Sequence, residues 1–141
     1  MLTYRAIEIF TSESARCRKK PLADAVIQYI RGLKIAARCI VTRGIAGCYE
    51  GGEVATTRLE VLSFNQPVRI YIVVPAEETD RVLDGLDGMI GEGIVALHDL
   101  NVLSYRANNT FFPRQLKVRD VMTPEPQSVA AATALPPKVL K

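Results

Sequence analysis

The residues that point most clearly to ligand binding are glycines, which occur in two short segments of the chain. Residues 43–52 hold four glycines after Arg43, and residues 88–93 hold three more. Because glycine has no Cβ, backbone N–H groups in such segments can approach an anion closely. Neither segment has the spacing of a P-loop, and a glycine at a helix end also serves as an ordinary cap. The segments are therefore candidate phosphate sites, with plain turns as the alternative.

Two arginines are placed to assist such a site. Arg43 stands at the start of the first glycine segment, and Arg106 stands at the end of the last predicted strand. If copies of the chain assemble around a symmetry axis, both could approach one phosphate, which a guanidinium can bind through two parallel hydrogen bonds. The alternative is that each arginine is a solvated surface residue.

The sequence offers no pattern typical of a catalytic or metal site. Its one histidine, His98, lies in an apolar strand sequence, where a structural role is the favoured interpretation. The adjacent Asp99 would point to the opposite face of that strand. Cys17, Cys39 and Cys48 have unrelated spacings, which favour reduced thiols over disulfides or zinc. We therefore expect neither an enzyme nor a metal centre.

Periodicity predicts the elements that would position these segments. Alternating or β-branched residues predict strands over 4–10, 35–42, 68–74 and 94–105, and apolar residues at helical spacing predict helices over 22–33 and 77–90. Residues 58–64 also resemble a strand, either paired with 68–74 in a hairpin or forming an arm of the preceding loop. The order is β-α-β-β-α-β, which predicts an α+β, ferredoxin-like fold with both helices on one face of an antiparallel sheet. Within the second predicted helix, Gly85 and Gly88 require a packing or binding reason.

Composition limits the function classes. A chain of 141 residues, 48% of them apolar, has room for one ordinary core, and a formal charge of +3 with scattered basic residues argues against nucleic acid. No apolar run approaches the roughly 20 residues that span a bilayer, and no signal-peptide core is present. We expect a cytoplasmic protein.

Several motifs resemble those of the nitrogen-regulatory PII proteins. Residues 88–95, Gly-Met-Ile-Gly-Glu-Gly-Ile-Val, are similar to the PII B-loop, and residues 42–47 stand where the flexible T-loop leaves the second strand. Ser12-Glu13-Ser14, Lys20-Pro21-Leu22 and Arg43-Gly44-Ile45-Ala46-Gly47 resemble a short stand-alone PII-like branch. The resemblance covers about residues 1–106.

This resemblance implies a homotrimer that binds adenine nucleotides in clefts between subunits. One cleft would be lined from two chains by residues 43–47 and 88–94, with Arg106 assisting at the phosphates. The residues implied in binding are Arg43, Gly44, Ile45, Gly47, Gly88, Gly91, Glu92, Gly93, Ile94 and Arg106.

Two departures from the PII pattern refine that expectation. Ile94 replaces the B-loop lysine, so we expect AMP or ADP to be favoured over ATP, because a hydrogen bond from a charged donor contributes about 1.5–3 kcal/mol. The glutamine that organises magnesium and 2-oxoglutarate has no counterpart, so no 2-oxoglutarate dependence is expected. The ligand would order or release the loop 44–57 and thereby switch a target protein. That target is unidentified, and a membrane transporter is among the candidates. Bicarbonate is a candidate second effector.

The end of the chain resembles another module. Residues 118–124, Val-Arg-Asp-Val-Met-Thr-Pro, are similar to the opening of a CBS domain, but the strand-helix-strand body of that domain is lacking. We therefore expect a PII-like domain over 1–106, a linker over 107–117 and an incomplete, poorly ordered CBS-like tail over 118–141. The alternatives for the whole chain are a CutA-like metal-binding trimer, a nucleotide-hydrolysing enzyme and a purely structural trimer.

Overall fold

Antiparallel pairing organises the main sheet of the domain. In this computed structural model, which describes residues 2–56, 65–108 and 113, the sheet order is β4-β7-β1-β8. Its strands are β1 (Leu2–Ser12), β4 (Arg38–Arg43), β7 (Pro67–Pro75) and β8 (Ile94–Val102). Each neighbouring pair is antiparallel. With helices α1 (Leu22–Leu33) and α2 (Thr79–Asp87), the main elements follow the predicted β-α-β-β-α-β order of an α+β fold.

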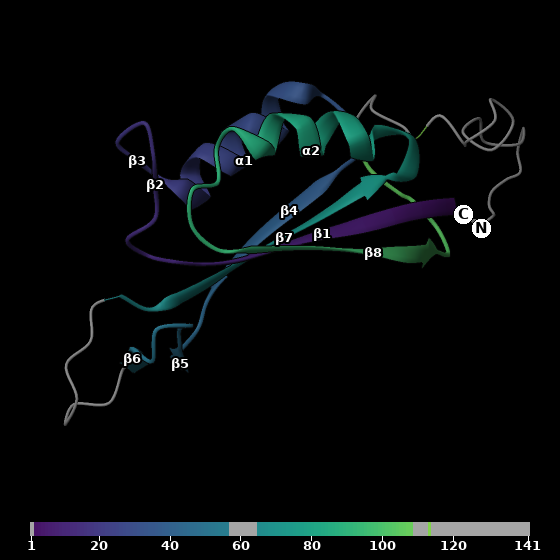
Figure 1. Cartoon of the computed structure of the whole chain (residues 1–141). Coiled ribbons are helices and arrows are strands. Elements are labelled where there is room, and N and C mark those ends of the chain that lie inside the picture. Colours follow the sequence, from purple (N-terminus) through teal and green to yellow (C-terminus); the bar gives the residue numbers. More distant parts are fainter. Residues whose placement is uncertain (1, 57–64, 109–112, 114–141) are drawn as a thin grey trace, which may run out of the picture.

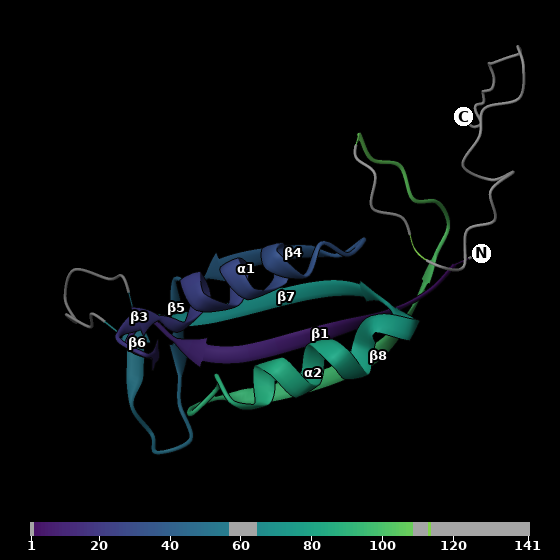
Figure 2. The same ribbon diagram turned by 90° about the horizontal axis from the view of Figure 1, so that it is seen from above.

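Both helices cover one face of the sheet, with α1 toward β4 and α2 toward β8 (Figures 1 and 2). The helix α1 begins directly after Pro21, whose φ of −55° suits a helix start. Its buried residues Leu22, Val26 and Ile30 recur every four positions and therefore form one stripe. This stripe packs in the same core as Ile7 and Ile9 of β1 and the alternate isoleucines and valines of β7. Within the described residues, the opposite face of the sheet carries no helix.

The second helix is shorter than predicted. A 3-10 turn, η1 (Ala76–Glu78), precedes α2, and the N–H groups of Met89 and Ile90 both donate to the Leu86 carbonyl, which closes the helix before residue 90. Gly85 has a packing reason, because a methyl group there would overlap the Tyr29 side chain of α1. A methyl group at Gly88, in contrast, would meet nothing within 4 Å. The helices thus approach closely at Gly85.

Four short strands form two hairpins outside the main sheet. They are β2 (Arg16–Cys17), β3 (Lys20–Pro21), β5 (Ala46–Cys48) and β6 (Val54–Thr56). The predicted glycine loop therefore contains a hairpin, β5–β6, which projects beyond one end of the sheet (Figure 1). Its turn is closed by a hydrogen bond from the Gly52 N–H to the Tyr49 carbonyl, and Gly52 has φ +94°.

The neighbours of β7 correct one prediction. Both of its edges are occupied, by β4 and by β1, so β4 takes the place of the predicted hairpin partner. Residues 58–64 themselves lie outside the described residues, as do most of the predicted linker 107–117 and all of the CBS-like tail 118–141. In the described part of the chain, no helix is long and apolar enough to cross a membrane.

Candidate functional site

A cavity of about 440 Å³ lies at the end of the sheet from which the β5–β6 hairpin projects. The strand register explains its position, because Arg43 pairs with Val68, Val68 with Thr11, and Phe10 with Ile94 at this one end. The lining residues come from five segments, namely 10–11, 42–44, 48–50, 67–69 and 92–94. The two glycine segments singled out in the sequence therefore meet here, although they lie far apart along the chain.

The structure brings half of the predicted site residues to this cavity. Arg43 and Gly44 line one side, and Glu92, Gly93 and Ile94 line another. The remaining five lie elsewhere, and they are Ile45, Gly47, Gly88, Gly91 and Arg106. Ile45 is 76% exposed and Gly47 lies in β5, while Gly91 lines a second cavity. Arg106 is exposed beyond Val102, at the opposite end of β8 from Ile94, so a single chain does not bring it to the cavity.

Arg43 is held by a carboxylate that lies in the turn after β1. Its Nη1 donates to Glu13 Oε2 at 2.7 Å, and Glu13 Oε1 accepts a hydrogen bond of 3.0 Å from the Gln66 N–H. The Arg43 hydrogen bond, followed by that from Gln66, lowers the pKa of Glu13 below its ordinary value. The backbone N–H of Glu13 also donates to the Gln66 carbonyl. Glu13 therefore joins both ends of the loop that carries the hairpin, since Arg43 precedes that loop and Gln66 follows it.

Two hydroxyl groups fix neighbouring parts of the cavity wall. Tyr49, on the hairpin, donates to the Asn65 carbonyl at 2.7 Å, and Thr11 donates through Oγ1 to the Glu92 carbonyl at 3.0 Å. Burial raises the pKa of Tyr49, and the charges of Glu92, Glu13 and other nearby carboxylates raise it further. The phenol is therefore neutral at physiological pH and keeps the proton that it donates to the Asn65 carbonyl.

The glycines at this site have identifiable backbone roles. A Cβ at Gly44 would lie 2.8 Å from Pro67 Cγ, and one at Gly47 would lie 3.1 Å from the same atom. Gly93 has φ +132°, and a Cβ there would lie 2.5 Å from the Phe10 carbonyl oxygen. Close approach between chain segments therefore accounts for these three glycines, whereas the space beside Gly91 is open.

A second arginine enters the cavity from β7 and belongs to a polar cluster on the helix-free face. Arg69 forms an ion pair with Glu8 at 2.6 Å and lies 4.6 Å from the centroid of the Tyr71 ring. His98 Nε2 lies 3.3 Å from the other carboxylate oxygen of Glu8, and its ring contacts that of Tyr71. These two contacts hold the His98 ring beside Glu8 and Tyr71.

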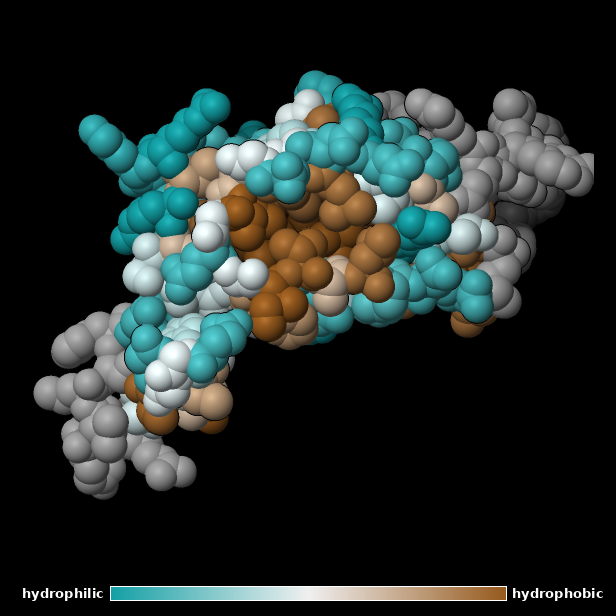
Figure 3. All heavy atoms as spheres, viewed as in Figure 1, coloured by the Kyte–Doolittle hydropathy of each residue, from teal (hydrophilic) through white to brown (hydrophobic). Residues whose placement is uncertain are grey.

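The second cavity, of about 300 Å³, is a groove between the end of α2 and the start of β8. Leu83, Leu86, Ile90 and Val95 supply its apolar walls. It shares Glu92 and Gly93 with the first cavity, so the two lie on either side of the same turn. Apolar surface is visible between α2 and β8 in Figure 3.

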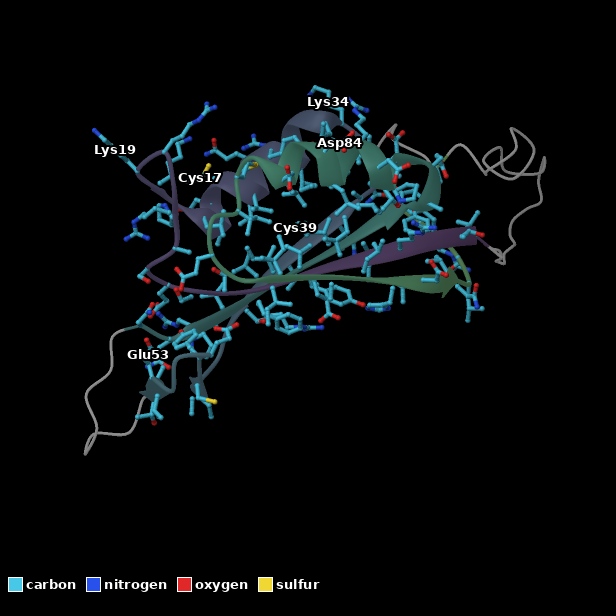
Figure 4. The ribbon with its side chains drawn as sticks, in the orientation of Figure 1. Cys17, Lys19, Lys34, Cys39, Glu53 and Asp84 are labelled. Atoms are coloured by element: carbon cyan, nitrogen blue, oxygen red, sulfur yellow. The ribbon has the colours of Figure 1, made fainter. Side chains whose placement is uncertain are left out.

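The cysteines lie on three different elements. Cys17 belongs to β2 and Cys39 to β4 (Figure 4), and Cys48 belongs to β5; all three are free thiols. Burial raises the pKa of the Cys39 thiol. Among residues 2–56, 65–108 and 113, no three His, Cys, Asp or Glu side chains form a group that could hold a metal ion.

Sequence reasoning assigned no role to three residues of this site. Glu13 stood in a recognised motif, Ser12-Glu13-Ser14, and that motif was the available signal. Tyr49 and Arg69 gave none, because the contacts of Tyr49 with Asn65 and of Arg69 with Glu8 join residues 16 and 61 positions apart. Such pairs become visible only when the strand register is known.

These features define a small α+β domain with a four-stranded antiparallel sheet, two helices on one face and a cavity under a glycine-bearing hairpin. The model of the DUF190 family, described as uncharacterized ACR, COG1993, matches residues 4–102. The chain therefore belongs to the DUF190 family. No curated protein matches the sequence.

Proposed function

We propose that this protein is a PII-like signalling protein that binds an adenine nucleotide in the cavity beside Arg43. One observation carries the proposal. The cavity joins Arg43 and Gly44, which begin the hairpin loop, to Glu92, Gly93 and Ile94 of the B-loop-like segment. Its volume of about 440 Å³ falls within the roughly 300–1,000 Å³ of small-molecule sites.

The lining offers both chemical surfaces that a nucleotide needs. Phe10 is 42% exposed, and with Tyr49 it supplies aromatic surface for a base. Arg43 supplies a guanidinium for a phosphate. AMP or ADP is favoured over ATP, because Ile94 stands where a further cation would reach a terminal phosphate.

A homotrimer is the assembly that this function requires. The helix-free face of the sheet exposes Phe10, Ile40 and Ile94, which supports burial of this face between copies of the chain in a ferredoxin-like, PII-like assembly. A neighbouring subunit would then bring Arg106 toward the phosphates. The hairpin wall of the cavity would respond to the ligand and switch contact with a target protein, a membrane transporter being one candidate.

Calorimetry tests the proposal directly. AMP, ADP, ATP, cyclic AMP and bicarbonate are titrated into the wild type, Arg43→Ala and Gly91→Val. We expect AMP and ADP to bind most tightly, and we expect Arg43→Ala to weaken them about 10- to 100-fold, which corresponds to the loss of a hydrogen bond from a charged donor. Gly91→Val is the control, because Gly91 does not line this cavity and a Cβ there meets nothing within 4 Å, so the fold and the binding should both be retained. If no nucleotide binds, the proposal is refuted. If the protein turns a nucleotide over, the protein is an enzyme and the proposal is wrong.

A further inference from the structure

Glu13 is the residue of this site whose contacts have consequences beyond nucleotide binding itself. It is not among the residues that line the cavity, yet its carboxylate contacts Arg43, which is. It also bonds to Gln66, at the other end of the loop. One carboxylate therefore holds the guanidinium of the candidate site and both ends of the hairpin loop.

We propose that Glu13 is a specificity-determining residue, a built-in competitor with a ligand phosphate for Arg43; this inference rests on the proposed function. The Arg43 side chain is 66% exposed and that of Glu13 is 28% exposed. A phosphate in the cavity therefore has access to the guanidinium. A phosphate that binds through Nη1 replaces the Glu13 carboxylate, and one that binds through the Nε–Nη2 edge meets a guanidinium whose charge Glu13 already neutralises in part.

The lowered pKa of Glu13 makes this competition persistent. Because Arg43 and Gln66 hold the pKa of its carboxyl below the ordinary value, Glu13 is charged at every pH at which a phosphate would be dianionic. A nucleoside has no phosphate to contact Arg43, so it leaves the ion pair between Arg43 and Glu13 intact. The competition therefore affects AMP and ADP and leaves adenosine unaffected.

Loss of the contact between Arg43 and Glu13 also changes how the loop that carries the hairpin is held. In the present structure, Arg43 at the loop's start and Gln66 at its end share the two oxygens of one carboxylate. When a phosphate takes Nη1 of Arg43, Glu13 keeps its contacts with Gln66 and the side-chain link between the two ends of the loop is lost, while the backbone hydrogen bond from the Gly44 N–H to the Pro67 carbonyl remains. Ligand binding is thereby coupled to the hairpin through a named contact.

The substitution Glu13→Gln separates charge from structure. Glutamine is nearly isosteric, and its amide oxygen can still accept the Gln66 N–H, whereas its neutral side chain holds Arg43 weakly. Asp80→Asn is the matched control, because Asp80 is exposed in the first turn of α2 and follows the end of β7 that is remote from the cavity. Both variants change the net charge by the same amount.

Calorimetry at fixed ionic strength measures AMP, ADP, adenosine and inorganic pyrophosphate against the three proteins. We expect Glu13→Gln to bind AMP, ADP and pyrophosphate about 2- to 5-fold more tightly than the wild type, the range expected when an exposed ion pair no longer competes. Adenosine affinity should stay the same, and Asp80→Asn should follow the wild type. The ratio of AMP affinity to adenosine affinity should therefore be higher in Glu13→Gln than in the wild type.

The possible failures are distinguishable. If nucleotides bind but Glu13→Gln gains nothing for AMP and ADP, or gains equally for adenosine, the inference about Glu13 is overturned and the proposed function stands. If pyrophosphate alone binds, and binds more tightly to Glu13→Gln, the nucleotide proposal fails while Glu13 keeps its role. If neither nucleotide nor pyrophosphate binds any of the three proteins, both proposals fall.

Discussion

The pair Gly91→Ala and Gly93→Ala tests whether backbone geometry accounts for the glycines of the B-loop-like turn. The two residues are separated by one position but differ in their surroundings. Nothing lies within 4 Å of a Cβ added at Gly91. At Gly93, φ is +132° and the added Cβ would lie 2.5 Å from the Phe10 carbonyl oxygen.

The expected magnitudes follow from that geometry. A side chain at the backbone conformation of Gly93 costs about 1–3 kcal/mol, and forcing a methyl group against the Phe10 carbonyl costs about 1–3 kcal/mol more. That carbonyl cannot move freely, because Phe10 pairs with Ile94 in the β1–β8 ladder. Gly93→Ala should therefore lower the free energy of unfolding by about 2–6 kcal/mol, a large share of the roughly 5–15 kcal/mol typical of a domain. Gly91→Ala should stay within about 0.5 kcal/mol of the wild type.

Urea denaturation followed by far-ultraviolet circular dichroism measures both free energies under identical conditions. The slope of the unfolding free energy against urea should be the same in all three proteins, so that the midpoints report stability alone. A Gly93→Ala protein as stable as the wild type would refute the backbone argument. Equal destabilisation by both variants would also refute it, because it would assign the effect to the whole turn.

Three further predictions concern packing, charge and assembly. Gly85→Ala should lower the free energy of unfolding by about 1–3 kcal/mol, because the methyl group displaces the Tyr29 side chain that packs between the helices; an unchanged urea midpoint would contradict this. Because the pKa of Glu13 is lowered in the folded state, its ion pair stabilises the fold above the ordinary value of 4.5 and is lost as the pH falls through the lowered pKa. The urea midpoints of the wild type and Glu13→Gln should therefore differ at neutral pH and converge in acid, and a constant difference would exclude this linkage. Ile40→Glu on the helix-free face should convert the proposed trimer of 15.5 kDa subunits into monomers in sedimentation experiments, whereas Ile27→Glu on the outer side of α1 should leave that trimer intact; equal effects of the two variants would show that the helix-free face is not the interface.

The sequence was sufficient to predict the main elements because their patterns are local. Alternation in β1 and the four-residue spacing of Leu22, Val26 and Ile30 each report burial of one face. Element ends were less accurate, since they depend on single contacts. The left-handed conformation of Lys34, with φ 55°, ends α1 and is followed by β4 at Arg38 rather than at residue 35.

The site was predictable only in part, for a physical reason. Residue types identified Arg43 and Gly93, because a guanidinium and a glycine have distinctive chemistry wherever they stand. The partners of those residues could not be found in this way. Glu13 lies 30 positions from Arg43, and the Phe10 carbonyl is a backbone atom that no residue type signals. The same contacts change the interpretation of the glycines, since close approach between segments explains Gly44 and Gly93 without any anion.

The charged residues that line the cavity determine which ligands a single chain can hold there. Among the described residues that line it, Arg43 and Arg69 are the cations, and each is paired with a carboxylate, while Glu50 and Glu92 add two more negative charges. Each additional phosphate therefore enters a region where the positive charge is already neutralised, and repulsion grows with phosphate number. For the proposed nucleotide ligand, this balance predicts that one subunit binds AMP more tightly than ADP and ADP more tightly than ATP. An ATP-selective site would need cations from a second copy, and Arg106, exposed beyond β8, is the residue that the proposed trimer would supply.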